Sequence, residues 1–315
     1  MKRKKILIGC CGGFSGIYLA KQFARFIDFE ILGFDSNPDS AAIFFCEKIF
    51  VLPKITDDVF LDKLINLLNN EKIDFYIPTY SKELLIIAKN QELFLNNTKT
   101  KCIISSYKTY QLLNDKLTAN RSLKEIGIPV PKIFQNKEEC VFPIIIKPSI
   151  GSGSLGLIKI NNKTELNQYV ANENDIMMEY LEGDEYTVDC LFDESCKLLG
   201  YNQRKRIKSL HGAVIITEND NSFDIFPFLS KIIESYEFKG CVNFQYILKN
   251  KIPYFIDINL RFAAGGLPLS VESGLDVPLA LRKMFLGETI KTDEFKSDFK
   301  KRTMYRYFEE KFITK

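Results

Sequence analysis

The sequence contains no long apolar run, no Cys-x-x-Cys pair and no large excess of either charge. About 18 consecutive apolar residues are needed to cross a bilayer, so no membrane-spanning helix is expected. The eight cysteines lack the spacing of a zinc site and are expected to be reduced, packed thiols. The 43 Lys and Arg residues nearly balance the 40 Asp and Glu residues, so the overall charge gives no reason to expect binding to nucleic acid or to an anionic membrane.

The basic start of the chain is not followed by the apolar core of a signal peptide. The apolar stretch after Lys5 reaches glycine at Gly9, which makes it too short for such a core. With reduced cysteines as well, the sequence predicts a cytoplasmic protein. Its 315 residues, 46% hydrophobic and 26% charged, are enough for two or three packed subdomains.

Strands and helices are expected to alternate along the first third of the chain. Expected strands cover residues 5–8, 30–34, 49–52, 75–78 and 102–104, with helical patterns at 17–26, 60–68 and 82–89. This alternation predicts βαβ units and a parallel sheet. After Ser105 we expect a helical stretch over 107–126, a stop at 127–131 where prolines cannot continue a helix, and then an α+β region to about Phe285.

A glycine-rich loop, residues 9–16, joins the first expected strand to the first helix, and Asp35 ends the next strand. This context suits a Rossmann dinucleotide site, whose glycines let a pyrophosphate approach a helix N-terminus. The spacing fits poorly, because Cys11 stands where the first glycine should be if Gly13 and Gly16 fill the last two positions. The alternatives are a Rossmann-like domain that only packs, or one that helps to hold a second substrate.

A second glycine-rich loop, residues 149–156, lies between two expected strands. Its glycine spacing matches the dinucleotide fingerprint, but a true fingerprint opens a helix, and here an apolar strand follows at 157–160. No Lys-Ser/Thr pair follows Gly156, so this is not a Walker A loop. Such a hairpin can fold over polyphosphate as a lid, with Lys147 adding a charge. An ordinary glycine hairpin with a surface lysine is the alternative.

From residue 115 to residue 287, the order of the motifs resembles that of the ATP-grasp enzymes. The segment 114–131 is similar to the family's stretch around the first of two nucleotide-binding lysines, here Lys116, and Lys147 matches the second. The resemblance implies that both lysines contact ATP phosphates under the glycine loop. The loop residues that it implies in nucleotide binding are Ser149, Gly151, Ser152, Gly153, Ser154 and Gly156.

Residues 176–189 resemble the hinge between the two halves of the ATP-grasp fold. The resemblance implies that Glu179 meets the adenine, while Tyr180 and Leu181 contribute backbone and apolar contacts. It also implies that Glu185 accepts hydrogen bonds from the ribose. Taken alone, the segment could equally be a strand that bears solvated acids.

Residues 240–261 resemble the strand pair that carries the metal site of the family. Residues two apart on a strand point to the same face, so Asp257 and Asn259 can share one site, with Gln245 beside them on the neighbouring strand. Oxygen ligands of this kind suit Mg²⁺ that bridges ATP phosphates, with Mn²⁺ as a substitute. Arg261 points to the same face and is expected to stabilise charge on the transferring phosphoryl group.

Within the family, the chain looks most like the carbamoyl phosphate synthetase large-chain group, through Gln245 and the segments 259–261 and 265–268. A single copy of the fold suggests a stand-alone ligase rather than the longer, two-half synthetase. The chain departs from the family pattern at Asp257, usually glutamate, and at Leu260, usually proline. The shorter aspartate still ligates magnesium, so activity is not excluded.

A basic run, residues 202–208, is expected on a strand that borders the active-site cleft of the resembled fold. Arg204 and Arg206 would share one face and bind a carboxylate or the terminal phosphate through bidentate contacts. A solvated face is the alternative. His211, the only histidine, could act as a base for an incoming amine, but a loop histidine without an identified partner is more often incidental.

The sequence therefore predicts an α/β, Rossmann-like N-terminal (pre-ATP-grasp) domain over residues 1–105, followed by an ATP-grasp fold of two α+β subdomains, 106–185 with the lid loop and 186–315 with the Mg²⁺ site. The expected activity is ATP-dependent ligation of a small carboxylate to an amine through an acyl phosphate. The alternatives are a kinase or carboxylating enzyme on the same fold, and a nonenzymatic ATP-binding module. A homodimer is left open, since the sequence does not decide the oligomeric state.

Overall fold

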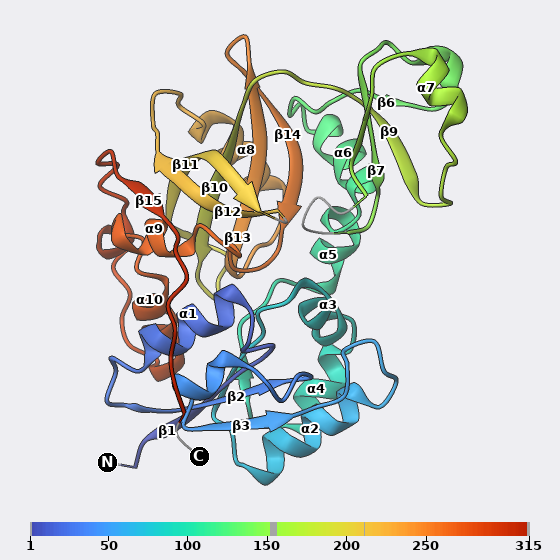
Figure 1. The fold of residues 1–315 in the computed structure, drawn as a ribbon. Helices are drawn as coiled ribbons and strands as arrows, with labels where there is room; N and C mark the ends of the chain where they lie inside the picture. The colour runs from blue at the N-terminus through green and yellow to red at the C-terminus, as the bar shows by residue number, and fades with distance from the viewer. Residues whose placement is uncertain (1, 152–155, 211, 314–315) are drawn as a thin grey trace.

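The computed structural model describes residues 2–151, 156–210 and 212–313, and within them the strands form three sheets of five, six and four members (Figure 1). The five-stranded sheet lies at the bottom of the view, the six-stranded sheet above it, and the four-stranded sheet at the upper right. Among the helices of these residues, none combines the length and the apolarity that crossing a bilayer requires.

The N-terminal sheet is parallel throughout, in the order β3-β2-β1-β4-β5, as the alternation of strands and helices predicts. Its strands are β1 (Lys4–Ile8), β2 (Phe29–Asp35), β3 (Lys48–Val51), β4 (Phe75–Ile77) and β5 (Lys101–Cys102). The helices between them are α1 (Phe14–Phe23), η1 (Ala41–Phe44), α2 (Phe60–Asn70), α3 (Ser81–Lys89) and α4 (Gln91–Asn97). The first helix begins three residues earlier than expected, and the expected helix at 82–89 is confirmed as α3.

The helical stretch expected over residues 107–126 is confirmed, and it consists of two helices. They are α5 (Tyr107–Leu113) and α6 (Lys116–Glu125). The Asp115 carboxylate accepts a hydrogen bond from the Thr118 backbone N–H at 2.8 Å, which caps the start of α6. This cap places Lys116 at the first position of a helix that packs against β14.

The two remaining sheets form the rest of the chain. The four-stranded antiparallel sheet, in the order β6-β9-β7-β8, consists of β6 (Ile133–Phe134), β7 (Ile144–Pro148), β8 (Ile158–Ile160) and β9 (Asp175–Glu179), with η2 (Lys137–Glu139) and α7 (Lys163–Gln168). The six-stranded sheet, in the order β14-β13-β10-β11-β12-β15, consists of β10 (Asp184–Phe192), β11 (Leu198–Leu210), β12 (Ala213–Asn219), β13 (Gly240–Lys249), β14 (Ile252–Asn259) and β15 (Thr303–Tyr305). The helices near it are α8 (Phe226–Ser235), α9 (Leu267–Glu272), α10 (Val277–Leu286) and η3 (Thr292–Phe295).

The hydrophobic core connects the N-terminal sheet to the six-stranded sheet. One cluster of buried residues contains both Leu7 of β1 and Val188 of β10, and a second places Phe75 of β4 against Phe285 of α10 with ring centroids 4.5 Å apart. The four-stranded sheet has a small cluster of its own, around Ile144 and Leu166. The first two sheets therefore share packed interiors, whereas the four-stranded sheet packs mainly on itself.

The first glycine-rich loop is held by contacts within its own domain. The Asp35 carboxylate accepts a hydrogen bond from the Gly12 N–H at 2.9 Å, and the Cys11 N–H donates to the Phe34 carbonyl oxygen. A Cβ at Gly9 would lie 1.6 Å from a carboxylate oxygen of Glu83, so the glycine is needed for close packing here. These contacts favour the alternative in which the loop only packs, because Asp35 is engaged by the loop itself.

Glu83 is a buried carboxyl group that organises the turn from β4 into α3. It accepts hydrogen bonds from the backbone N–H groups of Thr79 at 2.9 Å and Tyr80 at 3.2 Å, and one from the Tyr76 hydroxyl. Burial raises the pKa of Glu83 to about 7, although these hydrogen bonds oppose the shift. Glu83 therefore fixes the backbone immediately before and at the start of α3.

We expect the burial of Glu83 to make the fold less stable as the pH rises toward 7. The folded-state pKa of Glu83 lies above its unfolded value of about 4.3. The contribution of protonated Glu83 to the free energy of unfolding is therefore fully present below about pH 4.3 and is lost as the pH rises through about 7. Within this window the free energy of unfolding should fall by up to about 1.4 kcal/mol per pH unit, and Glu83→Gln should remove that slope. Urea denaturation between pH 5 and 8 measures it, with Glu92→Gln on the exposed surface of α4 as the control; parallel curves for wild type and Glu83→Gln would contradict the prediction.

Candidate nucleotide and metal site

A cavity of about 270 Å³ lies between the four-stranded sheet and the six-stranded sheet. Its walls come from β7 and β9 of the four-stranded sheet on one side, and from the start of β10, β13 and β14 of the six-stranded sheet on the other. The residues predicted from the sequence to bind nucleotide or metal that line this cavity are Lys116, Lys147, Gly151, Glu179, Tyr180, Leu181, Glu185, Gln245 and Asp257. Residues far apart in the sequence thus line one cavity, which combines apolar and charged side chains.

One end of the cavity is apolar. The side chains of Ile145, Met178, Leu181 and Ile247 line it from both sheets. The ring of Tyr180 also lines it and is covered by the Lys159 ammonium group, 3.8 Å from the ring centroid. A flat aromatic ligand such as a nucleobase can fit between apolar walls of this kind, with polar backbone groups of the hinge at its edge.

The two lysines approach the other end of the cavity from different elements. The Lys147 ammonium group, on β7, donates to the Ile256 carbonyl oxygen at 3.4 Å. Burial lowers the pKa of Lys147, while the Asp257 carboxylate opposes that shift. The Lys116 ammonium group donates to the Gly151 carbonyl oxygen at 2.8 Å. Two ammonium groups next to one carboxylate form a site suited to an anionic ligand that also binds a cation.

The three predicted metal ligands are neighbours on β13 and β14. Gln245 and Asp257 lie opposite each other in the strand pairing, and the Asn259 amide donates to the Asp257 carboxylate at 3.1 Å. No group of three His, Cys, Asp or Glu side chains with metal-binding geometry occurs in the described part of the chain. One carboxylate with two amide oxygens suits Mg²⁺ only when phosphate oxygens complete its coordination. In this structure the Asn259 NH2 faces Asp257 and its oxygen faces Arg261, so Asn259 would ligate the ion beside Asp257 only with its amide turned over.

Arg261 connects the end of β14, which carries the predicted metal ligands Asp257 and Asn259, to the N-terminal domain. Its guanidinium donates to the Asn259 side-chain oxygen at 3.0 Å and to the Ser81 hydroxyl, at the start of α3, at 2.8 Å. Burial lowers the pKa of Arg261, and the Asp257 carboxylate opposes that shift. Glu83 fixes the turn at the start of α3 and so positions Ser81, which contacts Arg261. We expect Arg261 to lie next to the transferring phosphoryl group. No pattern in the sequence indicates this contact with Ser81.

Arg206 lies close to Glu185, which lines the cavity. The Arg206 guanidinium is 2.8 Å from the Glu185 carboxylate and also donates to the Gly212 carbonyl oxygen at 3.0 Å. Burial lowers the pKa of Arg206, and Glu185 opposes this. The structure thus brings Arg206 to the predicted ribose end of the cavity, where it orients Glu185. Its predicted contact with the substrate stays a prediction.

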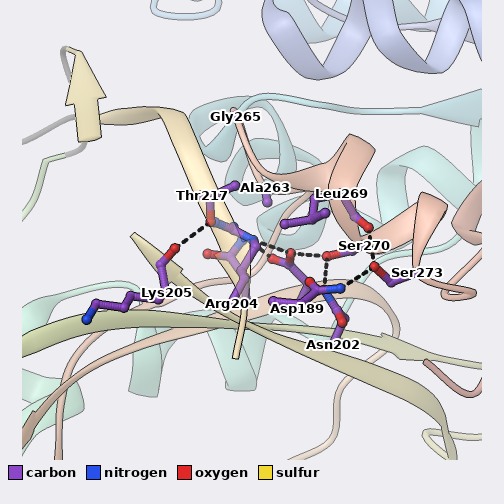
Figure 2. Close-up of polar contacts among 12 residues, drawn as sticks. Asp189, Asn202, Arg204, Lys205, Thr217, Ala263, Gly265, Leu269, Ser270 and Ser273 are labelled. Atoms are coloured by element: carbon purple, nitrogen blue, oxygen red, sulfur yellow. Dashed lines mark hydrogen bonds and ion pairs between the residues drawn. The ribbon is translucent and has the colours of Figure 1, made fainter. Parts of the chain in front are cut away.

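Arg204 is buried in a polar network away from the cavity, only 1% exposed (Figure 2). Its guanidinium donates to both oxygens of Asp189, at 2.8 and 3.3 Å, and the Ser270 hydroxyl donates to the same carboxylate at 2.5 Å. Asn202 donates to Ser270 at 3.1 Å. A Cβ at Gly266 would lie 2.0 Å from the guanidinium carbon, so the glycine makes room for this network.

Arg204 and Arg206 were expected to share one face, but the structure gives them different surroundings. The network around Arg204 joins β10 and β11 to α9, so this arginine has a structural role in the fold. Its side chain is not among the residues that line the cavity. A contact between Arg204 and substrate is therefore a prediction that this geometry does not favour.

Several predicted residues do not line the cavity or lie outside the described part of the chain. Ser149 is buried, and its carbonyl oxygen accepts a hydrogen bond from the Lys116 N–H at 2.9 Å. Gly156 is exposed, with φ +75°. The residues that lie outside the described part are Ser152, Gly153, Ser154 and His211.

The sequence did not single out most of the apolar walls. Ile145, Ile247 and Ile256 line the cavity but stand in ordinary strand patterns. Strand alternation puts Ile145 on the face of Lys147 and Ile247 on the face of Gln245. Ile256 is the extra residue at a shift in the β13–β14 register, which alternation does not predict. Their contribution to the site comes from the way the two sheets oppose each other.

Comparison with known proteins finds similarities over most of the chain. Residues 6–103 match a family described as PylC-like, N-terminal domain, and residues 172–307 match one described as ATP-grasp in the biosynthetic pathway with Ter operon. The chain is 23% identical over 297 residues to the carbamoyl phosphate synthase arginine-specific large chain of Bacillus subtilis, covering 84% of this chain and 27% of that protein. It thus spans about a quarter of the length of the curated relatives that it matches.

Solved structures share the fold at low sequence identity. N5-carboxyaminoimidazole synthetase from Staphylococcus aureus, complexed with ADP, has a TM-score of 0.77 and 18% identity, over 98% of this chain and 83% of that one. The L-amino acid ligase from Bacillus licheniformis has a TM-score of 0.70 and 16% identity, over 94% of this chain and 77% of that one. These likenesses show that the fold predicted from the sequence, a Rossmann-like domain followed by an ATP-grasp fold, is correct.

Removal of the Arg204 side chain should strongly destabilise the protein. Arg204→Ala leaves Asp189 buried without its cation, which typically costs about 3–5 kcal/mol of unfolding free energy. Arg25→Ala is the control, because it breaks a partly exposed ion pair with Asp276, with side chains 39% and 25% exposed, and such pairs contribute about 0–1 kcal/mol. Chemical denaturation of both variants measures the difference. Equal losses would show that the buried network contributes no more than a surface ion pair.

Proposed function

We propose that this chain, a member of the ATP-grasp superfamily, is an ATP-dependent ligase that joins a carboxylate to an amine. The observation that carries the proposal is the cavity between the four-stranded and six-stranded sheets, which has apolar walls at one end and Lys116, Lys147 and Asp257 at the other. A nucleoside triphosphate has the same order of apolar and anionic parts. The similarity to the carbamoyl phosphate synthase large chain and the fold shared with an L-amino acid ligase support this activity.

ATP binds in this cavity with its adenine between the apolar walls near Leu181 and its phosphates toward Asp257. Lys116 and Lys147 neutralise phosphate charge, and Glu185 receives hydrogen bonds from the ribose. Asp257, Asn259 and Gln245 would hold Mg²⁺. When bound, the ion would neutralise charge on the phosphates.

The reaction proceeds in two displacements. An oxygen of the substrate carboxylate attacks the γ-phosphorus, the bond to the β,γ-bridging oxygen breaks, and ADP leaves with the electron pair. The amine nitrogen then attacks the acyl carbon of the resulting acyl phosphate, the acyl C–O bond breaks, phosphate leaves, and the nitrogen loses a proton to solvent. Arg261, held by Asn259 and Ser81, stabilises the charge that develops on the transferring phosphoryl group.

The test is ADP and phosphate release with Mg·ATP across a matrix of carboxylic acids and amines, including bicarbonate. Lys147→Ala and Asp257→Ala should each lower the rate by about 100-fold or more, because each removes a charge that positions the triphosphate. Lys108→Ala and Asp62→Ala, on exposed surfaces of α5 and α2, are the matched controls and should keep the wild-type rate.

Each outcome of this matrix selects among the activities. Turnover that requires one acid and one amine identifies the ligase and its substrates. Turnover with an acid alone identifies a kinase, and turnover that requires bicarbonate identifies a carboxylating enzyme. ATP binding without turnover on the whole panel would support a nonenzymatic module, and failure to bind ATP would overturn the proposal.

A further inference from the structure

A second cavity, of about 520 Å³, lies between the N-terminal domain and β14. It shares Pro148, Gly151 and Asp257 with the nucleotide cavity, so the two spaces meet at the phosphate end of the proposed ATP site. Asn259 lines the second cavity as well. Its volume is in the range of sites that hold a small organic ligand.

The walls of the second cavity are largely apolar. The apolar side chains come from the loop after β3, from α3, from the loop after β7 and from β14; they are Ile55, Leu85, Ile86, Ile150, Ile258 and Leu260. Two of the polar groups already have partners in the protein. The Tyr110 hydroxyl donates to the Leu260 carbonyl oxygen at 3.0 Å, and the Ser81 hydroxyl accepts from Arg261. These two side chains therefore contribute apolar surface or fixed contacts rather than free hydrogen-bonding groups.

Charged groups are confined to two places in the second cavity. Within the described lining, Asp257 stands at the junction with the nucleotide cavity, and Lys82 lies at the exposed start of α3. The space between them, next to Leu85 and Ile86, has no charged side chain in that lining. An additional charge on a ligand placed there would lose its hydration without gaining an opposite charge.

We propose that this second cavity binds the acid substrate, and that the acid is one whose body beyond the reacting carboxylate is uncharged and largely apolar. The carboxylate lies at the junction, beside Asn259 and the γ-phosphate, and the apolar body extends toward Leu85 and Ile86. This inference rests on the proposed ligase function and adds the chemical class of its acid. It excludes bicarbonate and dicarboxylates as preferred acids.

The first measurement is binding, which does not depend on turnover. Protein loaded with Mg²⁺ and the β,γ-imido analogue of ATP is titrated by calorimetry with 4-methylpentanoate, 3-phenylpropanoate, glutarate, 4-aminobutanoate and bicarbonate. The two apolar acids should bind at least about tenfold more tightly than the charged ones. If neither apolar acid binds, or if a charged acid binds more tightly than both of them, the inference is overturned.

The second measurement locates the bound acid. Leu85→Glu places a carboxylate on the apolar wall and should weaken binding of the apolar acids at least about tenfold, while the affinity for the ATP analogue stays unchanged. Leu95→Glu is the matched control, because Leu95 is 61% exposed on α4 and does not line the cavity. Unchanged nucleotide binding shows that Leu85→Glu has folded. If Leu85→Glu fails to bind nucleotide, the measurement is made with Leu85→Gln instead. Equal losses in the Leu85 and Leu95 variants would overturn the inference.

The ADP-release matrix keeps the two proposals separate. If the apolar acids bind and Leu85→Glu abolishes their binding, but no acid or amine drives ADP release, the cavity assignment stands and the ligase function fails. If ADP release requires bicarbonate or a dicarboxylate and is unchanged in Leu85→Glu, the inference is overturned while ATP-dependent chemistry stands.

Discussion

The candidate site depends on the pairing of β13 with β14, which places Asp257 where the two cavities meet. Gln245 lies opposite Asp257 in this pairing, and Asn259 follows two residues later on the same face. Because side chains alternate along a strand, a shift of one residue in the register would turn these groups away from the nucleotide. The register of one strand pair thus fixes both the metal ligands and the junction between nucleotide and proposed acid.

The N-terminal domain contributes to the site through its packing rather than through its glycine-rich loop. Glu83 fixes the turn that begins α3, and Ser81 in that helix contacts Arg261. The same helix supplies Leu85 and Ile86 to the wall of the second cavity. A domain that resembles a dinucleotide-binding fold therefore shapes the second cavity, while its own glycine-rich loop is bonded to Asp35 and packed against Glu83.

Local patterns left open what depends on the partner of each side chain. A helical stretch was expected over 107–126, and the Asp115 side chain caps α6 and so divides that stretch into two helices. The alternation along β11 predicts Arg204 and Arg206 on one face, but it does not show that Asp189 of the neighbouring strand β10 holds Arg204 in a buried ion pair. A basic residue on a strand can be either a ligand contact or half of a buried ion pair, and only its partner decides which.

The sequence by itself determined the parallel sheet of the N-terminal domain, because hydrophobic periodicity and glycine or proline breaks are local properties of the chain. The order of its later motifs carried the resemblance to the ATP-grasp fold. It also predicted that Lys116, Lys147 and Asp257 belong to one site, and all three line one cavity. Only the tertiary structure decided that the two sheets enclose these groups with apolar walls, that Arg204 is buried and that Arg261 contacts Ser81. The physical reason is that burial and pairing depend on which surfaces meet across the fold, and no local pattern carries that information.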